Sequence, residues 1–312
     1  MGLLSDYLVG RNLKKILGFR GDASPAAPMY YAETWPDLLA EPFSFPSCGV
    51  TLQGYVYRKK GNDHPRGAMA AYHGIGGGHF SYMSVIDFCA ENGFLVYAYD
   101  NLGSGLSEGH AIENLSYADL SQKDFYAFLD QDPRAKGLKR YSIGHSWGGH
   151  AALASLRPEF GVSNVISFAG FDSVPRLYGG YAPKFAKMVY SYQRHAFGEV
   201  GVLSALTLMK ETKAQVLYVQ GDQDKLVPYE DNGLRFQKEL ADRSNIHFLI
   251  RKGSNHQCFW DQKTEKYYLE EIVDKKKGVN SLTRDLDRSF RDDLLRTIDP
   301  EVRQAMRDFW DR

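Results

Sequence analysis

Residues 138–153 read LKRYSIGHSWGGHAAL. The first six residues are strand-like, and residues 149–153 are suited to the start of a helix. Between them, Gly144-His145-Ser146-Trp147-Gly148 matches the pattern G-x-S-x-G, whose glycines permit a sharp strand-to-helix turn that exposes the serine hydroxyl. The segment therefore predicts a strand, a tight turn that carries Ser146, and a helix.

A second match to the same pattern shows that the five residues alone are weak evidence. Gly105-Leu106-Ser107-Glu108-Gly109 also fits, but Ser107 lies in a glycine-rich loop with no helix directly after it. A reactive serine of this kind needs a strand before it and a helix behind it. The context therefore favours Ser146 over Ser107 as the nucleophile.

The composition limits the classes of protein to which this chain can belong. It has 312 residues, of which 38 are basic and 38 acidic, so the formal net charge is zero. A neutral chain lacks the basic excess that phosphate backbones demand, and this excludes nucleic acid as a partner. Cys48, Cys89 and Cys258 are odd in number and far apart, which predicts free thiols in a reducing compartment and no metal site.

The amino-terminal stretch has an amphipathic pattern. Leucine, isoleucine and tyrosine residues recur with helical spacing within residues 3–17, with basic residues between them. Such a helix either lies on a membrane surface or packs on its own protein, and we favour the second arrangement. Its charges leave no secretory signal, and no apolar run reaches the roughly 20 residues that cross a bilayer. We therefore expect a cytoplasmic protein without a transmembrane segment.

Strand-like runs alternate with helical stretches from about residue 43 onward. Most of the runs are continuously apolar, as in strands that are buried on both faces of a parallel sheet. This alternation predicts an α/β fold with helices on both faces of the sheet. The expected strands cover residues 50–56, 68–72, 94–99, 138–143, 164–169, 215–219 and 246–250.

One connection between expected strands is unusually long. Residues 171–214 separate two strands, whereas such connections usually span only a few residues. The segment contains helical runs and many aromatic residues, so we interpret it as an inserted cap. Its aromatic side chains, Tyr178 and Tyr181 among them, either line a substrate pocket or pack the cap onto the body. The remaining expected parts are a helical segment (1–42), a catalytic domain (43–170 and 215–280) and a helical extension (281–312).

A serine hydroxyl becomes a good nucleophile when a base takes its proton and a third group holds that base. With the serine on such a turn, the expected chain order is serine, acid, histidine. Asp172, Asp222 and Asp224 each follow a strand at the edge where α/β sheets place their sites, so each is a candidate acid. His256 follows the last strand and satisfies the order. The other histidines considered are out of order or lie in the cap: His73, His79, His145, His150 and His195.

A glycine-rich stretch offers donors for an oxyanion. Tyr72-His73-Gly74-Ile75-Gly76-Gly77-Gly78 follows a strand, and its glycines let the backbone approach a substrate closely. It lacks the Gly-Lys-Ser/Thr ending of a phosphate-binding loop. We expect the backbone N–H groups of Ile75 and Trp147 to form the oxyanion hole, with His73 and Gly74 beside the substrate.

Four landmarks in this order make the chain resemble the α/β-hydrolase superfamily, and within it the branch of monoglyceride lipases and proline-iminopeptidase-like serine hydrolases. They are His73-Gly74 with its glycines, the loop 100–107, the turn 144–149, and Asp224 before Val227-Pro228 with His256. The resemblance implies a central, mostly parallel, eight-stranded sheet, a helical lid after the sixth strand, and hydrolysis without a cofactor or metal. It also favours Asp224 as the acid. Relatives usually carry arginine where this chain has Asn101, and we expect this departure to affect loop packing more than chemistry.

The expected function is therefore the hydrolysis of a carboxylic ester with a small or medium apolar acyl group, with Ser146, His256 and Asp224 as the catalytic residues. An aminopeptidase or amidase is the second interpretation, because the acidic residues Asp172 and Glu199 and their neighbour Glu211 form no cluster for a substrate ammonium. A ligand-binding protein without activity is a third, since fold does not fix function.

The carboxyl-terminal stretch 261–312 is dense in charges of both signs. Asp299-Pro300 is a typical helix start. Two apolar stripes with helical spacing should pack on the protein itself, and a homodimer contact is the alternative. They comprise Leu282, Leu286, Phe290 and Leu294, and then Val302, Met306 and Phe309.

Overall fold

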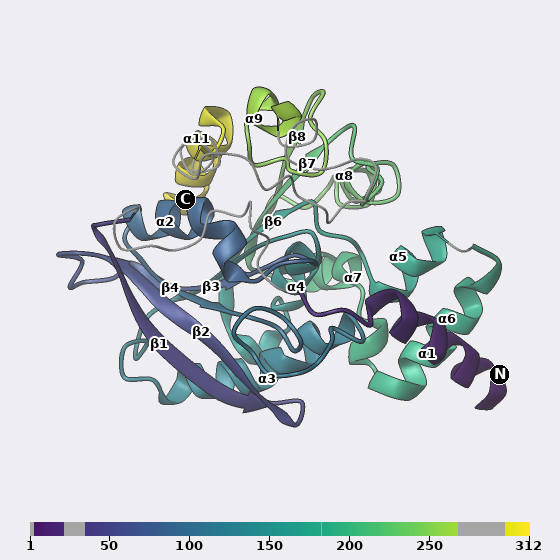
Figure 1. Cartoon of the computed structure of the whole chain (residues 1–312). Helices are drawn as coiled ribbons and strands as arrows, with labels where there is room; N and C mark the ends of the chain where they lie inside the picture. Colours follow the sequence, from purple (N-terminus) through teal and green to yellow (C-terminus); the bar gives the residue numbers. More distant parts are fainter. Residues whose placement is uncertain (1–2, 22–34, 182, 268–296) are drawn as a thin grey trace.

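The residues that the computed structural model describes, 3–21, 35–181, 183–267 and 297–312, are built around one eight-stranded sheet (Figure 1). Its strand order is β1-β2-β4-β3-β5-β6-β7-β8. The strands are β1 (Leu38–Ser47), β2 (Val50–Lys59), β3 (Gly67–Tyr72), β4 (Phe94–Tyr99), β5 (Arg140–His145), β6 (Val162–Phe168), β7 (Gln215–Gly221) and β8 (Ile246–Arg251).

Most of the sheet is parallel. Strands β3 to β8 pair in parallel, whereas β2 is antiparallel to both of its neighbours, β1 and β4. Parallel strands end at the same edge, so the loops after β3, β5, β7 and β8 meet there. The prediction of a mostly parallel eight-stranded sheet is confirmed.

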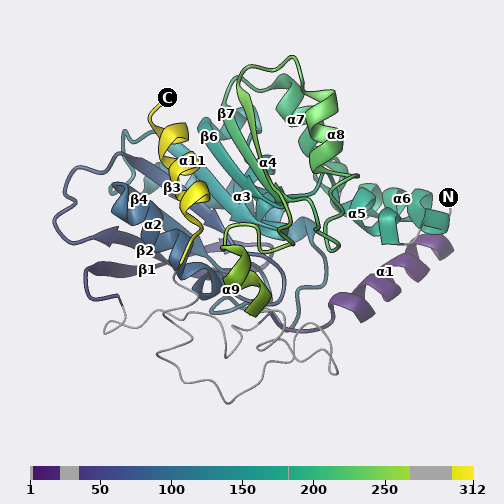
Figure 2. The same ribbon diagram turned by 90° about the horizontal axis from the view of Figure 1, so that it is seen from above.

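Helices cover both faces of the sheet (Figure 2). One core layer packs α3, α4, α7 and α8 against the sheet, and the other packs α2 and α11 against the opposite face. Neighbouring strand residues such as Val96 and Tyr97 belong to opposite layers, which explains the continuously apolar strands. The helices are α1 (Leu3–Leu17), α2 (Met83–Glu91), α3 (Ser116–Gln131), α4 (Trp147–Ala154), α5 (Val174–Tyr181), α6 (Ala186–Phe197), α7 (Ala205–Glu211), α8 (Gly233–Glu239), α9 (Gln262–Tyr267) and α11 (Pro300–Trp310), with short 3₁₀ turns η1 (His79–Tyr82), η2 (Pro158–Phe160), η3 (Pro183–Phe185) and η4 (Val200–Val202).

Strand β1 differs from the sequence prediction. It begins at Leu38, so residues 38–42 belong to the sheet and not to the expected amino-terminal helical segment 1–42. Pro42 and Pro46 lie within it, and proline cannot donate a hydrogen bond to a partner strand. The strand tolerates both residues because β1 is at the edge and pairs only with β2. Because of these prolines, residues 38–42 do not have the sequence pattern of a strand.

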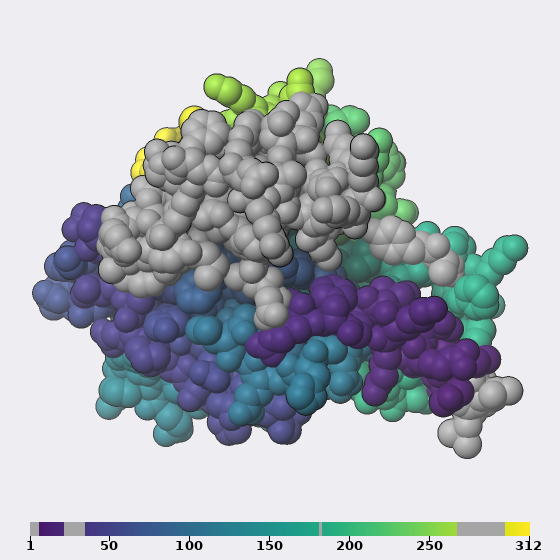
Figure 3. Space-filling model, in the orientation of Figure 1, coloured from purple at the N-terminus to yellow at the C-terminus, as the bar shows by residue number. Residues whose placement is uncertain are grey.

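The segment between β6 and β7 contains α5, α6 and α7 with the turns η3 and η4. Figure 1 shows α5 and α6 beside α1, at the end of the molecule away from β1. Val9 and Leu13 of α1 form a small apolar cluster with Val189 of α6, and Asp6 bonds the His195 ring at 2.7 Å. The amino-terminal helix thus packs on its own protein, with its outer side on the surface (Figure 3). No helix in the described ranges is both long enough and apolar enough to span a bilayer.

The carboxyl-terminal helix α11 belongs to the body of the protein. The Asp299 carboxylate accepts hydrogen bonds from the backbone N–H groups of Glu301 and Val302 and caps the helix, as its sequence predicted. The predicted stripe of Val302, Met306 and Phe309 is buried against the sheet. The other predicted stripe, 282–294, lies outside the described residues.

Candidate active site

Ser146 occupies a sharp turn between β5 and α4. Its backbone has φ 59° and ψ −118°, a conformation that costs a residue with a Cβ atom free energy. The turn is held on both sides: Ser146 N–H donates to the Phe168 carbonyl at 2.8 Å, and the Ser146 carbonyl accepts from His150 N–H at 2.9 Å. Strain that is held in place in this way presents the serine at the edge of the sheet.

The glycines of the pattern are required by packing. A Cβ atom on Gly144 would lie 2.1 Å from the Gly148 carbonyl oxygen, and one on Gly148 would lie 2.0 Å from the Tyr72 carbonyl oxygen. No side chain fits at such distances. The turn can therefore form only with glycine at both positions, which is why the pattern predicts it.

Asp224 and His256 lie together in the loops that follow β7 and β8. Asp224 Oδ2 is 2.8 Å from His256 Nδ1, and Asp224 Oδ1 accepts the N–H groups of Leu226 and Val227 at 2.9 and 3.0 Å. Burial alone would raise the pKa of Asp224, but the hydrogen bonds from His256 and Val227 hold it below the ordinary value. The carboxylate is therefore ionised at neutral pH and fixes the orientation of the imidazole ring.

The two other candidate acids have different contacts. Asp222 accepts the N–H of Gly253 at 2.7 Å. Asp172 is buried, pairs with Arg235 at 2.9 Å and accepts the N–H of Leu206 at 3.0 Å, near the start of α7. Both carboxylates thus hold the backbone or an ion pair, and Asp224 is the one that contacts His256.

The loop that carries His256 is held by a residue that the sequence analysis missed. Glu265 of α9 is buried, and its carboxylate accepts the Ser254 hydroxyl and the N–H groups of Asn255 and Gln257, each at 2.9 Å. These donors lie on both sides of His256. An acidic residue in a short helix after the histidine is a weak signal, because its pairing depends on where the helix packs.

The predicted oxyanion loop lies against the turn at Ser146. A Cβ atom on Gly74 would lie 3.3 Å from the His145 carbonyl oxygen and 3.5 Å from Ser146 Cβ, so the two segments lie side by side. His73 is buried, and its Nε2 accepts the N–H of Asn101 at 2.9 Å. Its Nδ1 therefore carries the proton and donates to the Gly74 carbonyl at 2.8 Å. This geometry indicates that His73 holds the loop in place. It favours that structural role rather than the substrate contact that we expected.

The expected oxyanion donors are the backbone N–H groups of Ile75 and Trp147. Ile75 is exposed in the loop after β3, and Trp147 is the first residue of α4, directly behind Ser146. The Gly74 carbonyl and the Ile75 N–H belong to one planar peptide unit and point in opposite directions. The bond from His73 to that carbonyl therefore also sets the direction of the Ile75 N–H.

The alternative serine, Ser107, is buried and has a structural role. It is 1% exposed, and its hydroxyl bonds the Asp100 carbonyl and the N–H of Gln53. The same loop, which contains Asn101, is also bound by a residue of the amino-terminal segment. The Arg20 guanidinium donates to the carbonyls of Gly105, Ser107 and Gly109. An arginine from another part of the chain thus holds the loop that contains Asn101.

Of the two predicted cap residues, the structure describes the side chain of one. Tyr178 of α5 is partly buried and packs between the main core and the cluster of α1 and α6. The side chain of Tyr181, at the end of α5, lies outside the described residues. A substrate contact by either residue stays a prediction.

The thiol groups have no role in this site. All three cysteines are free, and burial raises the pKa of Cys258, two residues after His256, well above its ordinary value. A buried thiol of this kind is a poor nucleophile. Across the described part of the chain, no three His, Cys, Asp or Glu side chains are grouped to hold a metal ion.

Comparisons with known proteins agree with this fold. The Hydrolase_4 family, described as serine aminopeptidase S33, matches residues 63–207. An esterase of Pyrococcus furiosus is 16% identical with a TM-score of 0.59, and the match covers 88% of this chain and 98% of that one. Est1E from Butyrivibrio proteoclasticus is also 16% identical, with a TM-score of 0.58 and coverage of 87% and 99%. No curated protein matches in sequence.

At this level of identity, the two solved structures establish the fold, and the family match covers the loop after β3, the loop after β4 and the turn at Ser146. These are three of the four landmarks on which the resemblance in the sequence rests, and the fourth, Asp224 with His256, lies outside the match. The chain therefore has the α/β-hydrolase fold, and over residues 63–207 it is similar to the Hydrolase_4 family.

Proposed function

We propose that this protein is a serine hydrolase that cleaves carboxylic esters through an acyl-enzyme. The observation that carries the proposal is the 2.8 Å contact between Asp224 and His256, at the sheet edge where Ser146 occupies its strained turn. His145, directly before Ser146, connects the turn at Ser146 to the loop of His256. Its Nε2 donates to the His256 carbonyl at 2.9 Å, and the two imidazole rings lie 4.7 Å apart.

The first half of the reaction forms the acyl-enzyme. Because His256 Nδ1–H donates to Asp224, Nε2 is the basic nitrogen that takes the proton of the Ser146 hydroxyl. The serine oxygen attacks the ester carbonyl carbon, and the negative charge that forms on the carbonyl oxygen is stabilised by backbone N–H donors. Each such donor contributes about 10²–10³ to the rate. The protonated His256 then gives its proton to the departing alcohol.

The second half releases the acid. His256 Nε2 takes a proton from a water molecule, whose oxygen attacks the acyl carbon. When the tetrahedral intermediate collapses, the proton passes to the Ser146 oxygen, and the carboxylic acid leaves. Asp224 stays ionised throughout and stabilises the imidazolium.

Two observations support an apolar ester as the substrate. Ile75 and Leu226 are 40% and 45% exposed, and each belongs to a loop that also contributes a residue to the site. Est1E has been solved with ferulic acid bound, which is a carboxylic acid that carries an aromatic ring. We therefore propose small or medium apolar acyl esters, with aromatic acids included.

An aminopeptidase is the second candidate, because the matching family is described as serine aminopeptidase. Such an enzyme needs a carboxylate to bind the ammonium of its substrate. Of the three acidic residues considered for this, Asp172 is buried against Arg235, and Glu199 pairs with Arg194 on the surface. The third, Glu211, is exposed at the end of α7. The existing partners of the first two are the evidence on this point, and they favour the ester over the peptide.

The test is a hydrolysis screen with nitrophenyl esters of graded acyl length, a feruloyl ester and a prolyl amide. The wild-type protein should cleave esters faster than the amide and be labelled by a fluorophosphonate. Ser146→Ala should remain folded and lose both the label and ester turnover. Ser107→Ala, which alters the second match to the pattern, should be labelled in proportion to its folded fraction. Wild-type protein that takes no label and cleaves no ester would contradict the proposal.

A further inference from the structure

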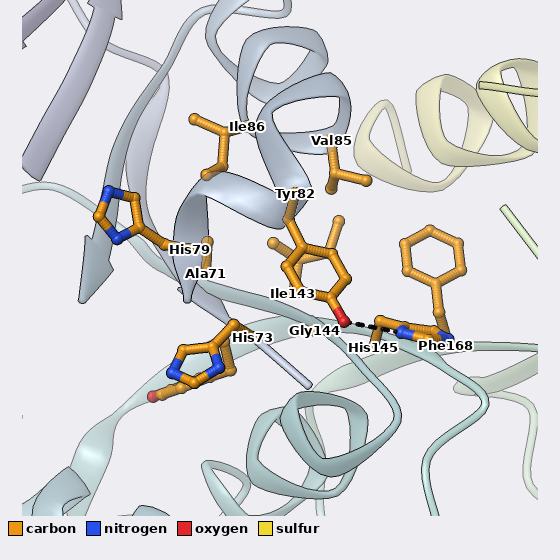
Figure 4. Close-up of a pocket in the computed structure, with 11 residues that line it drawn as sticks. Ala71, His73, His79, Tyr82, Val85, Ile86, Ile143, Gly144, His145 and Phe168 are labelled. Atoms are coloured by element: carbon orange, nitrogen blue, oxygen red, sulfur yellow. Dashed lines mark hydrogen bonds between the residues drawn. The ribbon is translucent and has the colours of Figure 1, made fainter. Parts of the chain in front are cut away.

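Three loops must keep a fixed relation in this site: the oxyanion loop, the turn at Ser146 and the loop of His256. Tyr82 lies at the end of η1, outside all three. Figure 4 shows its hydroxyl directed at the His145 ring, above the strands β3 and β5. No motif in the sequence pointed to Tyr82, and His145 was set aside as a candidate base because it precedes the nucleophile in the chain.

The hydrogen bonds form a continuous series. Gly74 N–H donates to the Tyr82 oxygen at 3.1 Å, and the Tyr82 hydroxyl lies 3.0 Å from His145 Nδ1. His145 Nε2 lies 2.9 Å from the His256 carbonyl oxygen. The series thus runs from the oxyanion loop through the residue before the nucleophile to the residue that is the proposed base.

The direction of each bond follows from the last one. A carbonyl oxygen only accepts, so His145 Nε2 carries the proton, and Nδ1 of the neutral ring is an acceptor. The Tyr82 hydroxyl therefore donates to Nδ1 and accepts from Gly74. Burial, together with the neighbouring His256, lowers the pKa of His145 to about 3, so the ring keeps this neutral form at ordinary pH.

The surroundings strengthen these bonds. The cavity beside them is lined by apolar side chains of β3, α2, β5 and β6, among them Ala71, Val85 and Phe168. His145 is also flanked by the ring of Phe259 at 5.2 Å. In such a low-dielectric environment a satisfied hydrogen bond is stronger, and a broken one leaves a costly unpaired group.

We propose that Tyr82 and His145 are positioning residues that hold the oxyanion loop and the loop of His256 in fixed positions relative to Ser146. The proposal rests on the proposed function. Neither side chain is assigned a contact with the reacting atoms. A displacement of the Ile75 N–H or of the His256 ring by a fraction of an ångström weakens transition-state stabilisation more than substrate binding.

The experiment must separate positioning from plain stability. The number of folded sites is counted by fluorophosphonate labelling, and ester turnover is expressed per labelled site. A merely structural loss lowers the count and leaves turnover per site unchanged. Tyr82→Phe should lower kcat per labelled site by about tenfold, with a smaller change in KM.

Two substitutions of His145 break the series at different bonds. His145→Asn places an amide oxygen near Nδ1, so it keeps the bond from Tyr82 and loses the donor to His256. His145→Gln places an amide nitrogen near Nε2, so it keeps the donor and loses the acceptor for Tyr82. Both should lower turnover per site. Tyr82→Phe should then cost less in the His145→Gln background than in the His145→Asn background, because one of its bonds is already lost.

Tyr126→Phe is the matched control, since it removes a buried hydroxyl whose partners are the side chains of Tyr72 and Ser142, in strands β3 and β5. It should lower stability and leave turnover per site at the wild-type value. Wild-type turnover per site in Tyr82→Phe and both His145 variants would overturn the proposal, as would an equal loss in Tyr126→Phe. Wild-type protein that takes no label overturns the proposed function instead, so the two failures are distinguishable.

Discussion

Two aspartate–histidine pairs lie close to Ser146, and they have almost the same geometry. Asp224 Oδ2 is 2.8 Å from His256 Nδ1, and Asp119 Oδ2 is 3.1 Å from His150 Nε2. The first pair connects the loops after β7 and β8, whereas the second joins α3 to the first turn of α4. By distance alone, either pair resembles a catalytic one.

The difference lies in the second ring nitrogen. His150 Nδ1 is 3.0 Å from the Phe171 carbonyl, so both nitrogens face acceptors, both must carry protons, and the side chain has no exposed surface. Burial alone would lower the pKa of His150, but Asp119 and the Phe171 carbonyl raise it above its ordinary value. His256 bonds its carboxylate through Nδ1 and keeps 12% of its side chain exposed, which leaves Nε2 for chemistry. A histidine beside a carboxylate is thus a base only where the opposite nitrogen can reach a substrate.

A third pair follows the same rule. His79 Nδ1 lies 2.9 Å from Asp100, and its Nε2 lies 2.9 Å from the Tyr57 hydroxyl. Both residues of this pair are buried. The pair joins the end of the glycine-rich loop to the loop after β4, and it offers no nitrogen to a substrate.

The same substitution in the first two pairs should have opposite consequences. In Asp224→Asn, the amide oxygen keeps the N–H bonds of Leu226 and Val227, so the amide NH₂ faces His256 Nδ1. That donor imposes the wrong tautomer, with the proton on Nε2. We expect kcat for ester hydrolysis to fall by about 10³–10⁴-fold with little change in stability. Steady-state kinetics check this, and near wild-type turnover would contradict the assignment of the acid.

Asp119→Asn should act on stability. It removes the buried counter-charge of the His150 imidazolium, and breaking one side of such a pair costs about 3 kcal/mol of unfolding free energy. Chemical denaturation measures the loss. Turnover per fluorophosphonate-labelled site should stay at the wild-type value, and a loss of turnover at an unchanged midpoint would show that this pair takes part in the chemistry.

The sequence was sufficient for the features that depend on short stretches of chain. The turn at Ser146 needs glycine at two positions for packing, and Asp224 and His256 directly follow strands whose ends meet at one edge. The cap of α11 by Asp299 is equally local. Each of these features is encoded within a few neighbouring residues, so a pattern can predict it.

The contacts that hold the site were not predictable in this way. Glu265 supports the loop of His256 from a later helix, Arg20 reaches the loop after β4 from the amino-terminal segment, and Tyr82 meets His145 across the sheet edge. Each contact joins residues that only the packing of separate elements brings together. A lone glutamate, arginine or tyrosine in the sequence carries no sign of such a partner.

The smallest expected effect is a pH dependence that separates the two pairs again. Because the folded pKa of His150 is raised, its charged form contributes stability in full below the unfolded value of 6.5, and this contribution is lost as the pH rises through the folded pKa. Without the Asp119 charge, the variant Asp119→Asn lacks most of that contribution. The difference in unfolding free energy between the wild type and Asp119→Asn should therefore shrink as the pH rises above 6.5. Denaturation curves of both proteins from mildly acidic to mildly alkaline pH measure it, and comparing them cancels groups that titrate alike in both. A difference that stays constant or grows with pH would mean that His150 is neutral in the folded protein, and the contrast with His256 would then have to rest on burial alone.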